Sequence, residues 1–277
     1  MESIPTVPVD GAQLVYRRIG GGRPLLVLNG VGATSADWDP SFVDRLASSN
    51  ELILLTNRGI GGSIDDGLSF DIAKLADDAA RVIETLGIER ASVMGWSMGG
   101  FIAQAFALNY VDRVDKLVLL STDPGGIEAD LASPDVWSEL IDTSGTPNEQ
   151  AKRLLFLLFP TGVAECFYRE FGDIVAAARA QLPVELLNRQ AVAMDEWHRN
   201  GVANQLRDIR VPVLIATGTE DIVIPASNAL KLVNAIPGAW LAQFPHGGHA
   251  FMAQYPRALA HLINSFLAVD RSAWRPV

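Results

Sequence analysis

Short, mostly apolar runs recur along the chain and alternate with longer segments whose apolar residues recur every three to four positions. The runs that predict strands are 24–28, 51–56, 90–94, 116–121, 211–217 and 239–244. The segments that predict helices are 70–86, 100–108, 225–235 and 255–267. A continuous apolar run is typical of a strand covered on both faces. The alternation therefore predicts an α/β fold with a mostly parallel, doubly wound sheet and helices on both of its faces.

Local signals mark the ends of some of these elements. The helix predicted over 70–86 has Asp71 in its first turn and Gly87 just beyond its end, which are typical of a helix start and stop. Near the N-terminus, Ala12–Arg18 alternates weakly between apolar and polar residues and predicts an edge strand. The glycines at Gly20–Gly22 predict the turn that follows it.

The stretch 123–207 interrupts this rhythm. It contains helical patterns but no convincing strand, and it is too long to be a loop inside a compact domain. We therefore expect one α/β core, formed by 1–122 and 208–277, that carries 123–207 as a helical lid. Most aromatic residues of the lid should pack it onto the core, while a few, with Phe156 and Phe159 as candidates, should line the roof of a pocket.

Composition fits this organisation. The chain has 277 residues, of which 49% are hydrophobic and 19% charged, so it can bury a large core and is not disordered. The formal net charge is −10, with a sequence pI near 4.8. Such a charge argues against nucleic acid or an anionic membrane surface as a partner.

The single cysteine, Cys166, excludes an intrachain disulfide and predicts a reducing compartment, with the thiol as apolar filler. Met1–Gly20 lacks the apolar stretch of a signal peptide. The longest apolar run, 154–159, is too short to span a bilayer. A cytoplasmic protein is expected. The same run could face the core or a second subunit, so a homo-oligomer stays open.

The strongest chemical signal is a G-x-S-x-G motif. Gly95, Ser97 and Gly99 lie directly between the strand predicted over 90–94 and the helix predicted over 100–108. A serine on such a strand–turn–helix junction adopts a strained backbone and presents its hydroxyl at the top of a sheet. A Cβ at either glycine would collide with a neighbouring element. Ser97 is therefore the candidate nucleophile.

A serine hydroxyl needs a base, and the base is usually a histidine. His246 and His249 lie in the loop between the last predicted strand and the last predicted helix. The glycine pair Gly247–Gly248 allows this loop to approach the serine, which favours His249, and His246 is expected to make a local hydrogen bond. His198 and His261 are expected to be surface or packing residues.

The histidine in turn needs a carboxylate that orients it. Ligand sites of open α/β sheets lie at the carboxyl ends of strands, so the acid is expected directly after a predicted strand. Either Glu220 or Asp221, after the strand 211–217, fits this position. Asp123, after the strand 116–121, is the competing candidate.

The oxyanion that forms during acyl transfer needs fixed N–H donors. The backbone N–H of Met98, directly after the candidate nucleophile, supplies one of them. The second is expected from the loop 29–32 after the first core strand, with Val31 as the candidate donor.

Taken together, these motifs resemble the α/β-hydrolase superfamily over nearly the whole chain. The segment Gly95–Gly100 is similar to the family's nucleophile elbow. Gly218–Asp221 looks like the family's acid loop, and this likeness selects Asp221 over Glu220. Gly248–Ala250 looks like the family's catalytic histidine loop. The resemblance implies the α/β-hydrolase fold and a Ser-His-Asp triad.

Asn57–Ser63 is similar to a structural segment of the same family, but two positions depart from the usual pattern. Asn29 stands where many members have histidine, and Asn57 replaces a more usual acid. The first departure concerns the shape of the oxyanion loop and the second only local hydrogen bonds. Because position 97 is Ser and not Asp, the resemblance argues against dehalogenase and epoxide hydrolase chemistry.

The expected function is a serine hydrolase that cleaves a small ester, lactone or thioester through an acyl-enzyme. Ser97, His249 and Asp221 would form the triad, and the N–H groups of Met98 and Val31 would hold the oxyanion. The resemblance points to small esterases, enol-lactonases and cofactor-free haloperoxidases, which use neither a metal nor an organic cofactor.

The same residues are compatible with other functions. The same triad could serve a perhydrolase that uses peroxide, a carbon–carbon hydrolase or lyase, or a ligand receptor with little turnover. In each case the partner is a small molecule. Five residues are expected to line its pocket: Gly30, Trp96, Phe156, Phe159 and Ile222.

Overall fold

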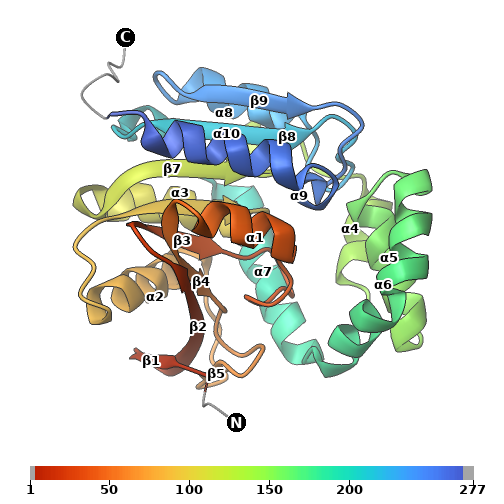
Figure 1. Cartoon of the computed structure of the whole chain (residues 1–277). Helices are drawn as coiled ribbons and strands as arrows, with labels where there is room; N and C mark the ends of the chain where they lie inside the picture. The colour runs from red at the N-terminus through yellow and green to blue at the C-terminus, as the bar shows by residue number, and fades with distance from the viewer. Residues whose placement is uncertain (1–3, 271–277) are drawn as a thin grey trace.

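One continuous sheet forms the centre of the protein, in a computed structural model that describes residues 4–270 (Figure 1). Its strands are β1 (Thr6–Val9), β2 (Ala12–Gly20), β3 (Arg23–Leu28), β4 (Asn50–Leu55), β5 (Ile64–Asp65), β6 (Ala91–Trp96), β7 (Val114–Leu120), β8 (Val213–Gly218) and β9 (Trp240–Phe244). Their order is β1-β2-β4-β3-β6-β7-β8-β9, with β5 paired to β2. The pairs from β4 to β9 are parallel, which confirms the predicted mostly parallel sheet.

The antiparallel edge differs from the prediction. The segment expected to be an edge strand is β2, but β1 pairs with its outer side and β4 with its inner side. The edge prediction was therefore wrong, because the short segment Thr6–Val9 contains Pro8 and gives little strand signal. A tight turn at Asp10–Gly11, with Gly11 at φ 70°, folds β1 back onto β2.

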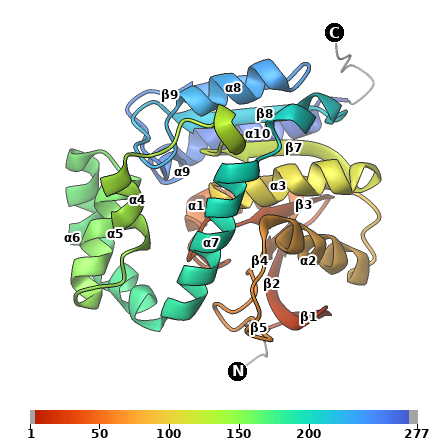
Figure 2. The same ribbon diagram turned by 180° about the vertical axis from the view of Figure 1, so that it is seen from behind.

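Side chains alternate between two apolar layers along the central strands. In β3, Leu26 and Leu28 belong to a cluster with helices α2 (Ile72–Thr85), α3 (Met98–Asn109) and α8 (Ser227–Ala235). Leu25 and Val27 belong to the opposite cluster, with α1 (Pro40–Ala47) and α10 (Pro256–Ala268). This period of two follows from strand geometry. The two views of the molecule show the helices on opposite faces (Figures 1 and 2).

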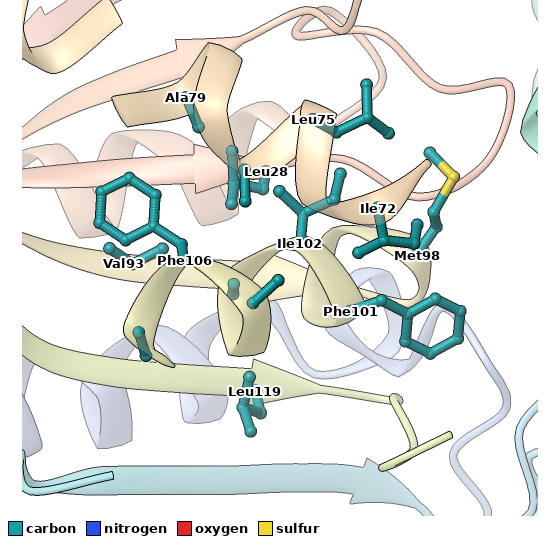
Figure 3. Close-up of a cluster of buried hydrophobic side chains, with 14 of the residues drawn as sticks. Leu28, Ile72, Leu75, Ala79, Val93, Met98, Phe101, Ile102, Phe106 and Leu119 are labelled. Atoms are coloured by element: carbon teal, nitrogen blue, oxygen red, sulfur yellow. The ribbon is translucent and has the colours of Figure 1, made fainter. Parts of the chain in front are cut away.

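Helix α2 shows how sequence pattern becomes packing. Asp71 caps its start by accepting a hydrogen bond from the N–H of Lys74 at 2.7 Å. Ile72, Leu75 and Ala79 then lie on one face and pack against α3 and the sheet (Figure 3). A fully buried side chain of the size of leucine contributes about 1.5–3 kcal/mol to folding. The packing of α2 on α3 thereby fixes α3, the helix that follows Ser97.

Between β7 and β8 the chain forms a helical insertion, as predicted. It consists of α4 (Pro134–Ile141), α5 (Pro147–Leu158), α6 (Thr161–Gln181) and α7 (Val184–Asn200). The remaining short helices are η1 (Val111–Arg113), η2 (Gly126–Glu128), η3 (Ala203–Asp208) and α9 (Phe251–Gln254). Helices α4, α5 and α6 stand beside the sheet, at the end towards which the arrowheads of β7 and β9 point (Figure 1).

Helix α7 joins the insertion to the core through an ion pair and an aromatic stack. Arg189 donates a hydrogen bond to Asp65 at 2.8 Å, and both side chains are largely buried. Near the other end of α7, the indole of Trp197 stacks on Phe101 of α3 with ring centroids 5.1 Å apart. The helix is thus fixed to the core near both of its ends.

Cys166 on α6 is exposed, so the prediction that it fills an apolar core was wrong. Its place in a two-helix layer leaves one side of α6 open to solvent. Within residues 4–270, none of the helices is both long and apolar enough to cross a membrane.

Candidate active site

Ser97 occupies a sharp turn between β6 and α3. Its backbone has φ 57° and ψ −124°, a conformation that residues other than glycine rarely adopt. The turn is held on both sides, because the Ser97 N–H donates to the carbonyl of Leu120 at 3.0 Å. The Ser97 carbonyl in turn accepts a hydrogen bond from the hydroxyl of Thr122 at 3.1 Å. The neighbouring strand β7 therefore fixes the serine backbone.

The glycines of the motif are required by contact. A Cβ at Gly95 would overlap the backbone of Gly99, and a Cβ at Gly99 would overlap the carbonyl of Leu28. Neither neighbour is a flexible side chain, so the backbone itself would have to move. The close approach of α3 to β6 and β3 thus depends on the absence of these two side chains.

We therefore expect Gly95→Ala to lower the free energy of unfolding by about 1–3 kcal/mol through overpacking. Urea denaturation followed by circular dichroism measures it. Gly21→Ala is the matched control, because a Cβ at Gly21 meets nothing within 4 Å and its φ is not positive. Equal stabilities of the two variants would contradict this account of the turn.

His249 and Asp221 form a buried pair at the carboxyl end of β8. The Nδ1 of His249 lies 2.9 Å from Oδ2 and 3.1 Å from Oδ1 of Asp221. The side chains are 3% and 0% exposed. Asp221 Oδ1 also accepts hydrogen bonds from the N–H groups of Val223 at 3.0 Å and Ile224 at 2.8 Å. These donors stabilise the carboxylate and fix its orientation.

The other loop residues pair with each other. Glu220 accepts a hydrogen bond from Nδ1 of His246 at 2.6 Å, and both side chains are exposed. The loop thus contains two acid–histidine pairs, of which only Asp221–His249 is buried. The local hydrogen bond expected for His246 is confirmed, with Glu220 as its partner.

Trp96 and α5 hold the backbone of His249 from two sides. The indole N–H of Trp96 donates to the carbonyl of His249 at 2.9 Å, and the two rings lie 5.4 Å apart. The carbonyl of Leu158, at the end of α5, accepts a hydrogen bond from Ala250 at 3.1 Å. No hydrogen bond joins His249 to the hydroxyl of Ser97 in the described part of the chain. The bond that would link base and nucleophile is often long before substrate binds.

The loop after β3 lies beside the serine. A Cβ at Gly30 would lie 3.3 Å from the Cβ of Ser97 and 3.2 Å from the ring of Trp96. Neither the N–H of Val31 nor that of Met98 donates a hydrogen bond within residues 4–270. Met98 is the first residue of α3, where a backbone N–H has no partner inside the helix. Both candidate oxyanion donors are therefore unpaired.

Two side chains hold this loop in place. Asn29 is fully buried, with its amide nitrogen 2.5 Å from the carbonyl of Leu55 and its oxygen 2.6 Å from the indole nitrogen of Trp38. Gln190 of α7 accepts a hydrogen bond from the N–H of Gly32 at 2.8 Å. The insertion thus contributes directly to the shape of the loop.

A cavity of about 620 Å³ reaches Ser97 from the side of α4, α7 and β8. Its walls are formed by Ser97, Phe101, Asp123, Asp130, Leu131, Ala132, Pro134, Trp137, Leu140, Met194, Asp195, His198, Arg199, Val223 and Ile224. The volume is in the range of small-molecule sites. The lining is mostly apolar, with polar groups from β7, α7 and the segment before α4.

None of the five residues predicted for the pocket lines this cavity. Gly30 lies against Trp96 and Ser97, and the ring of Trp96 lies beside that of His249. Phe159 stacks on Phe167 of α6 with ring centroids 4.3 Å apart. Phe156 is partly buried in the same layer, and Ile222 is 48% exposed. Their role in a pocket stays a prediction.

A second, partly buried acid–histidine pair lines the cavity. Asp123, the competing acid, directs Oδ2 to Nε2 of His198 at 3.3 Å and is 1% exposed. It makes no hydrogen bond with His249 within the described residues. His198, expected to be a surface or packing residue, packs against Phe101 and Trp137 and also lines the cavity that contains Ser97.

Asp130, which lines the cavity, forms an ion pair with α8. Asp130 contacts Lys231 at 2.6 Å and accepts a hydrogen bond from Ser227 at 2.6 Å. Hydrogen bonds from Lys231 and Ser227 hold the pKa of Asp130 below its usual range. Its carboxylate therefore stays charged at neutral pH and fastens the segment before α4 to the core.

Two site residues gave no useful signal in the sequence. Gln190 is one of several polar residues on an amphipathic helix, and its contact with Gly32 joins positions 158 apart. His198 lies in an ordinary helical pattern that does not indicate which side of the helix faces the cavity. Within the described residues, no cluster of three or more His, Cys, Asp or Glu side chains could hold a metal ion.

Comparison with known families agrees with this fold. Residues 23–254 match the family model described as "alpha/beta hydrolase fold". The chain belongs to this family. The match begins at β3 and ends in α9, and so includes the serine turn, the acid loop, the histidine loop and the whole insertion.

Relatives cover several kinds of hydrolase. The chain is similar to "Putative carbamate hydrolase RutD" of Azorhizobium caulinodans, with 31% identity over 92% of this chain and 95% of the relative. It is 27% identical to "Putative non-heme bromoperoxidase BpoC" of Mycobacterium tuberculosis, over 92% and 97% of the two chains. A solved hydrolase of Pseudomonas aeruginosa superposes with a TM-score of 0.81, at 26% identity, over 97% of this chain and 99% of the other.

Proposed function

We propose that this hydrolase cleaves a small ester, lactone or thioester through an acyl-enzyme formed on Ser97. The observation that carries the proposal is the position of Ser97, which occupies a strained turn on the wall of a 620 Å³ cavity. Trp96, the residue before Ser97, donates a hydrogen bond to the backbone carbonyl of His249, which forms a buried pair with Asp221. This arrangement supports a role for Ser97 as a nucleophile that faces the cavity and for His249 as a base oriented by a carboxylate.

The proposed reaction follows from these contacts. Asp221 accepts a hydrogen bond from Nδ1 of His249, so the other ring nitrogen, Nε2, is free to accept the proton of Ser97. As the serine oxygen attacks the carbonyl, the N–H groups of Met98 and Val31 stabilise the oxyanion. His249 then passes the proton to the leaving group. A water molecule, deprotonated by His249, attacks the acyl-enzyme and releases the acid.

The helical insertion would act as a cap in this reaction. We propose that 123–207 forms a unit distinct from the core of 1–122 and 208–277, and that α4 and α7 close the cavity over the acyl chain. Cavity walls from α4 and α7, such as Leu140 and Met194, support this assignment. Enclosure by these helices would exclude bulk water from the serine.

A fluorophosphonate probe tests the nucleophile directly. We expect it to label the native protein and to locate on Ser97 when the labelled peptide is sequenced by mass spectrometry. Competition by p-nitrophenyl esters of increasing acyl length would rank the substrates at the same time. Labelling of another serine, or none, would overturn the proposal.

Gln190, which accepts a hydrogen bond from Gly32, provides a test of whether the loop 29–32 must be held in place for catalysis. We expect Gln190→Met to lower kcat about fivefold, because loss of one hydrogen bond of about 1 kcal/mol releases Gly32. Stability should not fall in parallel, because the amide nitrogen of Gln190 is buried without a partner within residues 4–270. Steady-state kinetics and urea denaturation measure both effects.

Gln181→Met is the matched control, because Gln181 is exposed at the end of α6. We expect no change of kcat in this variant. If Gln190→Met loses stability and keeps its kcat, Gln190 only fills space between α7 and the core.

A second candidate function uses the same residues with a different acceptor. Hydrogen peroxide in place of water would convert the acyl-enzyme into a peracid. The bromoperoxidase relative, 27% identical over 92% of this chain, favours testing this reaction. Bromination of a dye in acetate buffer with bromide and peroxide would detect the peracid, because the peracid oxidises bromide to the brominating species. Absence of bromination alongside rapid ester hydrolysis would assign water as the acceptor.

A further inference from the structure

A second imidazole is fixed in the wall of the catalytic cavity, away from the proposed triad. His198 lies near the end of α7, with its side chain 15% exposed, and it lines the same cavity as Ser97. The proposed reaction gives it no role. Phe101 and Trp137 meet its ring edge to face, each with centroids 5.6 Å away. These contacts hold the plane of the imidazole.

Asp123 fixes which nitrogen carries the hydrogen. Its Oδ1 accepts hydrogen bonds from the N–H of Gly125 at 2.7 Å and from the indole of Trp197 at 3.3 Å. Oδ2 remains for Nε2 of His198 at 3.3 Å. Because a carboxylate only accepts hydrogen bonds, Nε2 is the protonated nitrogen of this pair. The neutral ring therefore has an acceptor lone pair at Nδ1.

The Nδ1 atom of His198 has no hydrogen-bond partner among the residues that the structure describes. The surrounding walls are mainly apolar, and they consist of Phe101, Leu131, Trp137, Leu140, Met194, Val223 and Ile224. In such a cavity, a few polar groups determine how the ligand is oriented. The charged residues of the lining are Asp123, Asp130, Asp195 and Arg199, so acidic groups outnumber basic ones and disfavour an anionic ligand here.

We propose that His198, oriented by Asp123, is a specificity residue that binds a hydroxyl or amide N–H group of the substrate. The recognised substrate has an apolar chain with a neutral hydrogen-bond donor, placed away from the carbonyl that Ser97 attacks. This inference rests on the proposed hydrolase function and adds a substrate class to it. Asp123 is then a positioning residue for His198 and does not serve the triad.

A chain-length series of paired esters tests the proposal. The pairs are p-nitrophenyl esters whose acyl chains end either in a hydroxyl or in a methoxy group. A hydroxyl donates a hydrogen bond and an ether oxygen only accepts one. We expect the native protein to prefer the hydroxyl ester by about tenfold in kcat/KM at the chain length that reaches His198. A ratio near one at every length would overturn the proposal.

Two variants test whether the preference for the hydroxyl ester depends on His198 and Asp123. His198→Phe keeps a ring of similar shape but removes both nitrogens, and we expect the hydroxyl-to-methoxy ratio to fall to about one. In Asp123→Asn, the amide can donate to Nε2 of His198, so Nδ1 becomes a donor and the same ratio also falls. A merely structural role would lower both rates in proportion and leave the ratio unchanged. His261→Phe, on the exposed side of α10, is the matched control and should keep the native ratio.

Binding without turnover separates this inference from the proposed function. Methyl ketones with the same hydroxyl-ended and methoxy-ended chains can be titrated by calorimetry against the native and His198→Phe proteins. We expect about tenfold tighter binding of the hydroxyl ketone, lost in the variant. If Ser97 proves not to be the nucleophile but this difference persists, the proposed function fails and the binding subsite stands. Equal binding of both ketones to the native protein would overturn the subsite even where Ser97 is labelled.

Discussion

Ser97→Ala is expected to lower kcat for a p-nitrophenyl ester by a factor of about 10⁴ to 10⁶, which corresponds to about 5–8 kcal/mol of barrier. The reason is that the acyl-enzyme cannot form without the serine oxygen. The unpaired N–H groups of Met98 and Val31 remain, so some rate above the uncatalysed reaction should persist. Stopped assays at high enzyme concentration would measure this residual rate.

Ser121→Ala is the appropriate control for this variant. Ser121 is also a buried serine with positive φ, at 42°, and it follows the neighbouring strand β7. It does not line the cavity. We expect Ser121→Ala to retain nearly full activity. If Ser97→Ala also retains its activity, while both proteins are folded by circular dichroism, the acyl-enzyme mechanism is wrong.

Local signals in the sequence predicted the parts of this protein that depend on local structure. The serine turn is an example, because Gly95 and Gly99 are needed by contacts that lie within a few residues or on the adjacent strand. The central strands were predicted because burial on both faces makes them apolar throughout. The short strand Thr6–Val9 was missed, since pairing with β2 and not its own pattern stabilises it.

Contacts between the insertion and the core could not be predicted in this way. Phe156 and Phe159, for example, pack in the layer that α5 forms with α6 and are not part of the lining of the cavity beside Ser97. Conversely, His198 reaches the cavity because α7 crosses the carboxyl ends of the strands. The packing of the four insertion helices against one another determines which face of each helix meets the core. Helical periodicity alone does not determine that face.

Substitution by asparagine tests whether Asp221 or Asp123 is the acid of the proposed triad. Asp221→Asn is expected to lower kcat by about 10⁴. Oδ1 of residue 221 accepts hydrogen bonds from the N–H groups of Val223 and Ile224, so an asparagine would keep its oxygen there. Its NH₂ group would then face Nδ1 of His249. The imidazole would carry its hydrogen on the nitrogen that must accept the proton of Ser97.

The control is Glu220→Gln, because the exposed Glu220 side chain pairs only with His246 among residues 4–270. We expect it to leave the rate unchanged. The contrary result is a full rate in Asp221→Asn together with a loss of about 10⁴ in Asp123→Asn. That outcome would assign the triad acid to β7, and His249 would then have to turn from Asp221 towards Asp123 during catalysis. The present geometry opposes such a turn, because Trp96 and Leu158 hold the histidine loop from two sides, and the buried Asp221 would lose its imidazole partner.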